Sequence, residues 1–274
     1  MSNSKNKKLF AGPYLGELGW ELFCWQGYIR WLSESFDHTT ICCRKGLSGL
    51  YKDFADKIIE YNPPTYSPSC ERNTGDCGNY PKPDRTYSKY IGPNPSPSEV
   101  PIYQAALGDY AFRFPQKFFK YGNINSTIKT FDILIHARSR SSSGGVDTDN
   151  RNLAKESWEN IVSYLKNKNY TIASIGSTKD SLHISNTTDL RGINIDELCD
   201  YCHKAKCMMS PSSGPLHLAA LCGTEIIVWS GDSYNEHRYK KAWNPFNNKV
   251  HYINGWGNVD ISKIKQSIDN LDER

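Results

Sequence analysis

The sequence predicts an α/β fold made of two Rossmann-like domains facing a cleft. Strand and helix patterns alternate in two series along the 274 residues. A proline-rich stretch, residues 62–101, separates the two series and holds most of the 14 prolines. Such alternation is typical of parallel sheets covered by helices, and the length allows two small domains. We therefore expect an N-terminal domain at 1–128, with the proline-rich stretch as an insertion, and a C-terminal domain at 129–274.

The first series runs from a short apolar segment at 8–12 into a glycine-bearing loop. Apolar and aromatic side chains then recur at helical spacing over 20–32, which predicts a helix packed on a sheet. A strand is expected at 39–43 and a second helix at about 47–61. This strand–helix–strand–helix order is that of one Rossmann-like half.

The second series follows an aromatic and basic segment, 108–121, whose secondary structure the sequence does not define. Apolar runs of strand length alternate there with amphipathic stretches and with a polar, glycine- and serine-rich loop at 139–150. We expect strands at 131–137, 170–176, 206–210 and 225–230, and helices at 154–167, 195–205, 214–222 and about 260–271. The last helix either stays with this domain or crosses back to the first.

Composition and charge limit the class of protein. With 38% hydrophobic and 23% charged residues, the chain has the composition of a soluble globular protein. No apolar run approaches the ~20 residues that span a bilayer. The basic start lacks the apolar stretch of a secretory signal, so we expect a cytoplasmic protein, and the nine irregularly spaced cysteines favour reduced thiols. A net charge of +4 permits an anionic ligand without requiring nucleic acid.

A turn of small residues joins a predicted strand to the helix expected at 214–222. Ser212 or Ser213 can cap this helix, and Gly214 lets a ligand approach the backbone closely. The first-turn N–H groups and the helix dipole suit a phosphate, and His217 can add a donor. The alternative is a capped packing helix in which His217 is hydrogen-bonded to a neighbouring loop.

Residues 189–231 resemble the C-terminal donor-binding domain of the heptosyltransferases, which are glycosyltransferase family 9 enzymes of the GT-B type. In that family a D-[ST]-G-x-x-H-x-A-A motif holds the diphosphate of a nucleotide-sugar. Ser213, Gly214 and His217 match the hydroxyl, glycine and histidine of the motif, whereas Ser212 stands where the family usually has Asp. The resemblance implies a GT-B fold and a nucleotide-diphosphate-sugar donor.

The N-terminal loop is similar to the strand–loop–helix entry of the same family, where a Gly-Asp pair supplies a carboxylate at the cleft. Glu17, after Gly16, fits that position with Glu in place of Asp. A carboxylate there can accept the proton of the acceptor hydroxyl as the sugar is displaced, and Glu21 is the second candidate for this role. The alternative is a surface glutamate that stabilises the helix dipole.

Two arginines, Arg138 and Arg140, follow the first strand of the second domain, at the end where open α/β sheets bind ligands. Guanidinium groups bind phosphate in a bidentate manner and can stabilise a departing nucleoside diphosphate. Solvated loop charges are the alternative. Arg151 and Lys155 are weaker candidates for the same role, and Glu236, after the last core strand, could hydrogen-bond a ribose.

Other motifs do not support a different chemistry. A CxxCH pattern at 199–203 matches c-type haem attachment, but it falls inside a predicted helix of a chain without a secretion signal. Zinc binding by these residues with Cys207 is disfavoured because that cysteine is expected on a buried strand. The glycines form neither GxGxxG nor GxxxxGK[ST], which argues against a dinucleotide oxidoreductase and a P-loop NTPase.

Aromatic and basic residues interleave in two segments, a mixture that stacks bases and contacts phosphates in nucleic-acid binders. An acceptor-binding lid or a hydrophobic interdomain seam is the favoured interpretation. The residues are Arg85, Tyr87, Lys89, Tyr90, Phe112, Arg113, Phe114, Lys117, Phe118, Phe119 and Lys120. A nucleic-acid partner is therefore allowed but not favoured.

Taken with the resemblance, these residues predict an inverting, metal-independent glycosyltransferase. It would need no cofactor beyond the nucleotide-sugar donor and would act on a hydroxyl of a saccharide or glycoconjugate. One rival is a glycosyltransferase that modifies a hydroxymethylated base in DNA. Another is a non-catalytic nucleotide-sugar-binding module, which Ser212 in place of Asp keeps open.

Overall fold

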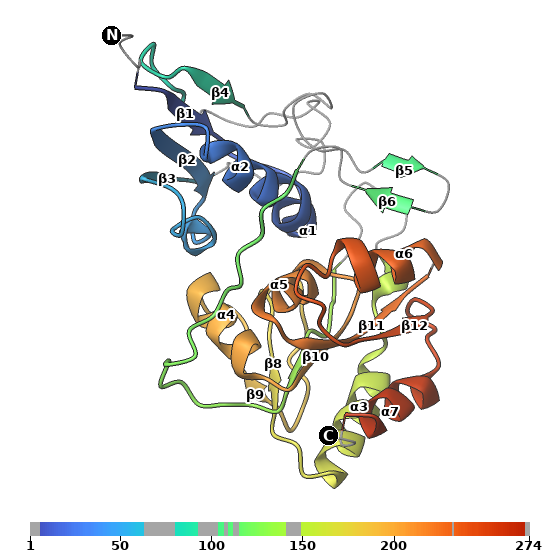
Figure 1. The fold of residues 1–274 in the computed structure, drawn as a ribbon. Coiled ribbons are helices and arrows are strands. Elements are labelled where there is room, and N and C mark those ends of the chain that lie inside the picture. The colour runs from blue at the N-terminus through green and yellow to red at the C-terminus, as the bar shows by residue number, and fades with distance from the viewer. Residues whose placement is uncertain are drawn as a thin grey trace. The chain divides into compact units, whose positions relative to one another are not determined.

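The structure is a computed structural model that describes residues 6–62, 80–92, 104–106, 109–111, 115–140, 149–231 and 233–271. The chain divides into two compact units, Met1–Phe119 and Lys120–Arg274 (Figure 1). Each unit contains a parallel sheet with helices, so the predicted α/β fold with two Rossmann-like units is confirmed. Much of the proline-rich stretch and most of the loop at 139–150 lie outside the described residues.

The N-terminal sheet has the strand order β3-β2-β1-β4, and its neighbouring strands are parallel. Its strands are β1 (Lys8–Ala11), β2 (His38–Arg44), β3 (Lys57–Tyr61) and β4 (Lys89–Ile91). A small antiparallel hairpin, β5 (Gln104–Ala106) and β6 (Asp109–Ala111), belongs to the same unit. Because β4 lies within the proline-rich stretch, a segment expected to be irregular supplies an edge strand.

A continuous helical segment follows β1. It consists of α1 (Leu18–Trp20), a π-helical turn (Glu21–Trp25) and α2 (Gln26–Ser33). Leu22, Trp25 and Ile29 are fully buried at helical spacing, which explains why the sequence pattern predicts this helix correctly at 20–32. A π-helical turn adds a residue to the helical repeat, and such turns are frequent at functional sites.

The prediction of a helix at about 47–61 is wrong. A 3-10 turn at Ser48–Leu50 is followed by further turns and then by strand β3. Ile58 and Ile59 pair with residues of β2, and β-branched side chains favour this extended state. The apolar spacing that suggested a helix arises because Tyr51 is buried by the turn and the isoleucines belong to the sheet.

The C-terminal sheet has the strand order β12-β11-β10-β7-β8-β9, again with parallel neighbours. Its strands are β7 (Ile133–Ile135), β8 (Ile172–Ser174), β9 (Thr188–Asp189), β10 (Cys207–Pro211), β11 (Glu225–Ser230) and β12 (Val250–Asn254). Its helices are α3 (Lys155–Asn167), α4 (Ile195–Lys204), α5 (Gly214–Cys222), α6 (Ser233–His237) and α7 (Ile261–Asp269). All strands and helices expected here are present within a few residues of their predicted bounds, whereas β9, β12 and α6 are not predicted.

Helices cover both faces of the C-terminal sheet (Figure 1). Strands β10 and β11 are buried along their whole length, as is typical of a parallel sheet. One face packs on α3 and α7 through a core that includes Trp158, Trp229 and Ile264. Helix α5 contacts β10 and β11 and packs against α4. Because α7 packs on α3, the last helix stays with the C-terminal unit.

The segment at 120–128 packs on α4 and α5. The backbone N–H of Tyr121 donates to the Leu221 carbonyl at 3.0 Å, and that of Asn123 donates to the Asp200 carboxylate at 2.7 Å. These contacts place the segment in the C-terminal unit, although the sequence suggests that it ends the N-terminal domain.

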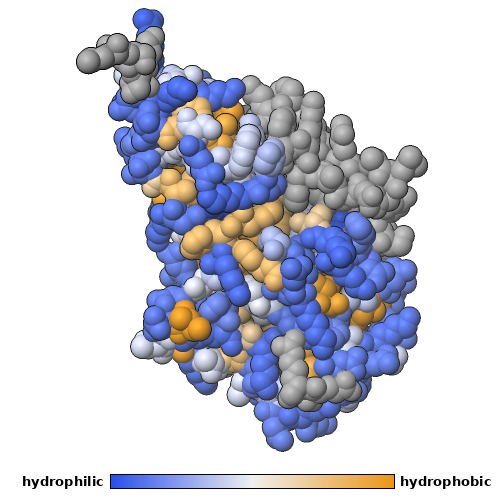
Figure 2. Space-filling view, viewed as in Figure 1, coloured by the Kyte–Doolittle hydropathy of each residue, from blue (hydrophilic) through white to orange (hydrophobic). Residues whose placement is uncertain are grey.

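The C-terminal unit shows a mostly hydrophilic surface on the face drawn in Figure 2. Among the described residues, no helix combines the length and the apolar character needed to cross a membrane. The described cysteines are buried free thiols, namely Cys24, Cys42, Cys43, Cys199, Cys202, Cys207 and Cys222.

Candidate functional site

The N-terminus of α5 lies directly after the carboxyl end of β10, where the chain turns through Ser212 and Ser213. Ser213 occupies the N-cap position with an extended backbone (φ −158°, ψ 160°), but its side chain makes no capping hydrogen bond. The expected serine cap is therefore absent from this helix. An uncapped N-terminus leaves backbone donors and the positive end of the helix dipole to an anion. Gly214, the first helical residue, places no Cβ over these donors.

The Ser213 hydroxyl is held by a buried histidine from the neighbouring strand. His136 directly follows β7, and its Nδ1 lies 3.0 Å from Ser213 Oγ and 3.2 Å from Ser210 Oγ. The two serine hydroxyls lie 2.9 Å apart. Burial, with a smaller effect from the charge of Arg138, lowers the pKa of His136 from 6.5 to about 4. The imidazole is therefore neutral at pH 7 and orients the hydroxyls without adding charge.

Ser212 is held from the other side of the turn by an aromatic cluster. The Tyr239 hydroxyl donates to Ser212 Oγ at 2.7 Å and lies 3.5 Å from His217 Nε2. The rings of Tyr239 and His217 are parallel within 4°, with centroids 5.2 Å apart, and Trp243 packs edge-on against both. Burial lowers the pKa of His217 from 6.5 to about 3, so its ring is also neutral.

Arg138 lies at the same edge of the sheet, two residues beyond His136. Its side chain is almost fully buried, and Nη1 donates to Asn152 Oδ1 at 2.6 Å. The Asn152 amide also contacts the backbone of Arg140 in both directions, accepting from its N–H at 3.3 Å and donating to its carbonyl at 3.0 Å. Asn152 therefore fixes the guanidinium of Arg138 and the course of the backbone at Arg140.

The weaker candidates have different surroundings. The guanidinium of Arg151 lies 5.3 Å from the ring centre of Trp256 as a cation–π pair, and its charge acts on Tyr239. Lys155 is exposed and forms a pair with a glutamate one turn later on α3. The carboxylate of Glu236 accepts a hydrogen bond from Lys240 at 2.6 Å, and both side chains are about half exposed.

The two glutamates that are candidates for the general base differ in burial and in their hydrogen bonds. Glu17 is half-buried at the N-cap position of α1, and its side chain makes no capping hydrogen bond. Glu21 is fully buried in the π-helical turn, where its carboxylate accepts hydrogen bonds from Tyr51, at 2.6 Å, and from Arg44. Glu21 is therefore a structural ion-pair residue and not an accessible second candidate for a base.

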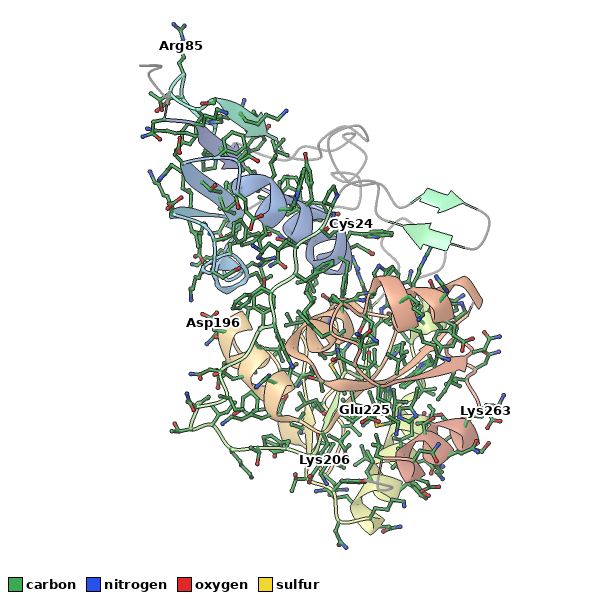
Figure 3. All side chains as sticks on the ribbon, viewed as in Figure 1. Cys24, Arg85, Asp196, Lys206, Glu225 and Lys263 are labelled. Carbon is green, nitrogen blue, oxygen red and sulfur yellow. The ribbon has the colours of Figure 1, made fainter. Side chains whose placement is uncertain are left out.

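The aromatic residues of the first aromatic and basic segment, Tyr87 and Tyr90, pack within the N-terminal unit. The Tyr87 ring packs edge-on against Phe10 at 5.4 Å, and its hydroxyl hydrogen-bonds Thr40 at 2.9 Å. Tyr90 also packs against Phe10, with centroids 5.8 Å apart. Arg85 projects away from the sheet (Figure 3). In the second segment, residues 112–114 lie outside the described part of the chain.

The CxxCH motif lies on α4 and faces α5. The thiols of Cys199 and Cys202 are buried close to that of Cys222, and His203 Nδ1 lies 3.0 Å from the Cys222 carbonyl. Across the described ranges, no group of three or more His, Cys, Asp or Glu residues is arranged to hold a metal ion. The motif therefore contributes to packing between the two helices.

The structure brings together at one sheet edge the predicted residues Arg138, Ser212, Ser213, Gly214 and His217. It adds three residues that sequence reasoning missed, namely His136, Asn152 and Tyr239. His136 precedes Arg138 at the end of a strand, a signal that was available in the sequence. The roles of the other two depend on contacts between distant segments.

Two open α/β units define a GT-B-type fold. The structure is similar to that of a glycosyl transferase family 9 protein from Veillonella parvula, with a TM-score of 0.57 and 10% sequence identity over 99% of this chain and 98% of that one. It is also similar to Escherichia coli ADP-heptose lps heptosyltransferase II, with a TM-score of 0.59 and 12% identity over 97% and 98% of the two chains.

A third solved structure, E. coli heptosyltransferase WaaC with ADP, gives a TM-score of 0.57 and 11% identity over 97% of this chain and 99% of that one. Neither a protein-family model nor the sequence of a curated protein matches the chain. At these identities the likeness is one of fold, and it confirms the heptosyltransferase-like GT-B architecture that the sequence predicts.

Proposed function

We propose that this chain is a glycosyltransferase that binds a nucleotide-diphosphate sugar and transfers the sugar to an acceptor hydroxyl. The observation that carries the proposal is the uncapped N-terminus of α5, with two fixed serine hydroxyls in the turn before it and the buried Arg138 just after β7, the strand beside β10. Backbone N–H groups, hydroxyls and a guanidinium are donors that suit a diphosphate. The heptosyltransferase-like fold supports the same class of reaction.

The diphosphate would be held by Ser212, Ser213, Gly214 and Arg138, with Arg140 and Arg151 as further cationic contacts. Breaking the bond between sugar and diphosphate develops negative charge on the leaving phosphate oxygen. A positioned guanidinium and the helix dipole stabilise this charge, and we propose that the reaction proceeds without a divalent metal. His217 is neutral and so would contribute through shape and hydrogen bonding.

We assign Glu17 as the general base that accepts the acceptor hydroxyl's proton during a single inverting displacement. Its half-buried carboxylate follows the strand–loop segment of the N-terminal unit and is not used as a helix cap. A Glu17→Gln variant should keep donor affinity but lose sugar transfer by about 100-fold or more, which is the range of general base catalysis. Transfer at the wild-type rate would remove Glu17 from the mechanism.

ADP-sugars are the first donors to test, because one structural neighbour was solved with ADP and another with ADP-D-beta-D-heptose. The proposed acceptor is a saccharide or glycoconjugate. The alternative of a non-catalytic donor-binding module is supported by Ser212, which replaces the aspartate of the heptosyltransferase motif. Donor binding without turnover on any saccharide acceptor would favour that alternative.

The deciding experiment measures calorimetric binding of ADP, UDP, GDP, CDP and TDP, each with and without Mg²⁺. We expect one nucleotide to bind in both conditions and Arg138→Gln to weaken its affinity about tenfold or more. Lys263→Gln is the matched control, because it removes an exposed cation from α7 in the same unit (Figure 3). No binding across the panel would overturn the proposal.

A further inference from the structure

Tyr239 belongs to a π-helical turn, Arg238–Ala242, that directly follows α6. Its side chain is fully buried between His217, Trp243 and Tyr252. The phenol oxygen nevertheless ends at the turn before α5, where it contacts Ser212. The Tyr239 side chain therefore packs in the core through its ring and forms a hydrogen bond at the candidate site through its hydroxyl.

In the structure, the Tyr239 hydroxyl is the donor of its hydrogen bond to Ser212 Oγ. Tyr239 has one hydroxyl proton, and its short contact is the 2.7 Å bond to Ser212 Oγ, with His217 Nε2 further away at 3.5 Å. Burial raises the pKa of Tyr239 well above its usual range, so the phenol keeps this proton. The phenol oxygen remains able to accept from the imidazole.

Ser212 therefore receives a proton from Tyr239 and must direct its own hydroxyl proton elsewhere. Its backbone N–H is already used, because it donates to the Trp229 carbonyl at 3.0 Å. Ser212 lies two residues before Gly214, the first residue of α5, whose uncapped start the proposed function assigns to a diphosphate. A phosphate oxygen bound there would be an acceptor for the Ser212 hydroxyl proton.

We propose that Tyr239 is a positioning residue that makes Ser212 a hydrogen-bond donor to a phosphate oxygen of the nucleotide. The inference rests on the proposed function and deepens it. A carboxylate at position 212 accepts hydrogen bonds from hydroxyls, whereas an oriented serine donates to an anion. The Tyr239–Ser212 pair therefore fits a ligand that presents a phosphate oxygen to residue 212. This differs from the heptosyltransferase motif, in which an aspartate stands at that position.

A double-mutant cycle in the full-length protein tests this role. The variants are Tyr239→Phe, Ser212→Ala and the double variant, and the readout is the dissociation constant of the tightest-binding nucleotide from the diphosphate panel. We expect each single change to weaken binding about three- to tenfold, the range of one hydrogen bond. The double variant should be no weaker than Ser212→Ala alone, because both changes remove the same interaction.

Two controls separate positioning from simple packing. Tyr252→Phe removes a neighbouring hydroxyl that donates to the Ser230 carbonyl at 3.0 Å, so it should leave nucleotide affinity unchanged. Ser212→Thr keeps the hydroxyl and should retain most of the affinity. Unliganded melting temperatures show whether Tyr239→Phe folds normally, since its ring still packs on His217.

The outcomes are distinguishable. Additive losses in the double variant, or wild-type affinity in Tyr239→Phe, would overturn the positioning role while the proposed function stands. A wild-type protein that binds no nucleotide of the panel would overturn both. Non-additive losses with an unchanged Tyr252→Phe control would establish Tyr239 as the residue that orients Ser212.

Discussion

The two units each contain a strand, a short turn and a helix start, yet they use polar side chains in opposite ways. In the N-terminal unit, the acid of the π-helical turn, Glu21, is buried and paired with Arg44. In the C-terminal unit, the turn before α5 carries neutral groups, two serine hydroxyls oriented by His136 and Tyr239. A buried carboxylate that is paired with a fixed counter-charge, as Glu21 is with Arg44, has little capacity left for a ligand. Neutral hydroxyls in the turn before α5 do not neutralise the positive end of the helix dipole, which remains able to attract an anion.

The largest effect should come from breaking the buried pair of the N-terminal unit. Glu21→Gln removes the charge that balances Arg44 and weakens the acceptor of the Tyr51 hydroxyl. We expect a loss of about 3 kcal/mol in the free energy of unfolding, typical of a buried ion pair that loses one partner. Urea unfolding of the variant measures this loss.

The matched control for that variant is Glu34→Gln. Glu34 pairs with Lys117 in the same unit, but both side chains are more than half exposed. Exposed pairs contribute less than about 1 kcal/mol, so this variant should unfold almost as the wild type does. Equal losses of unfolding free energy in the two variants would mean that burial does not make the Glu21–Arg44 pair contribute more to stability than an exposed pair.

Acidification should destabilise the C-terminal unit through its buried histidines. The pKa of His136 is about 4 in the folded protein and 6.5 ordinarily, so the unfolded state binds the proton more tightly. Stability is therefore fully present above pH 6.5 and falls as the pH drops toward 4. In His136→Asn, the slope of unfolding free energy against pH should decrease by up to about 1.4 kcal/mol per pH unit.

His183 provides the comparison for the pH experiment. It is an exposed residue of the same unit, and its Nε2 lies 3.1 Å from the Thr187 carbonyl. His183→Asn therefore controls for the replacement of an exposed histidine in the same unit. A similar slope in the wild type and in His136→Asn would contradict the neutral, buried imidazole at Ser213.

A carboxylate can also be introduced into the turn before α5 by substitution at Ser212. Ser212→Asp replaces an oriented donor with a carboxylate beside the proposed diphosphate. We expect nucleotide affinity to fall about tenfold through charge repulsion, whereas the neutral Ser212→Asn should lose less. Calorimetric titration with the tightest-binding diphosphate measures both. Tighter binding by the aspartate variant would mean that position 212 faces hydroxyls of the ligand and not its phosphates.

Local patterns were sufficient to predict the turn before α5 but not the groups that hold it. Gly214, Pro215 and the two serines lie within a few residues of each other, and their preferences mark a helix start. The contact between His136 and Ser213 spans 77 residues and exists because β7 lies beside β10 in the sheet. Sequence periodicity carries no information on that neighbour relation.

The same limit explains the errors in the N-terminal unit. Glu21 is the second candidate for the base in the sequence, but its carboxylate is paired with Arg44, which lies 23 residues away on the next strand. The helix wrongly expected at 47–61 has apolar spacing consistent with a helix, and pairing of β3 with β2 overrides it. Both errors arise where a tertiary contact decides between states that the local sequence allows.

The smallest effect should come from Glu236, the proposed ribose contact. Its pair with Lys240 is exposed and one helical turn apart, so Glu236→Gln should change the free energy of unfolding by less than about 0.5 kcal/mol. If its carboxylate binds the ribose, the variant should lose the preference for ADP over 2′-deoxy-ADP, or for the corresponding pair of the nucleotide that binds. Lys240→Gln breaks the same pair but should keep that preference. An unchanged preference in Glu236→Gln would reduce Glu236 to a surface ion pair and confine the ligand contacts of the C-terminal unit to the turn before α5 and the arginines beside it.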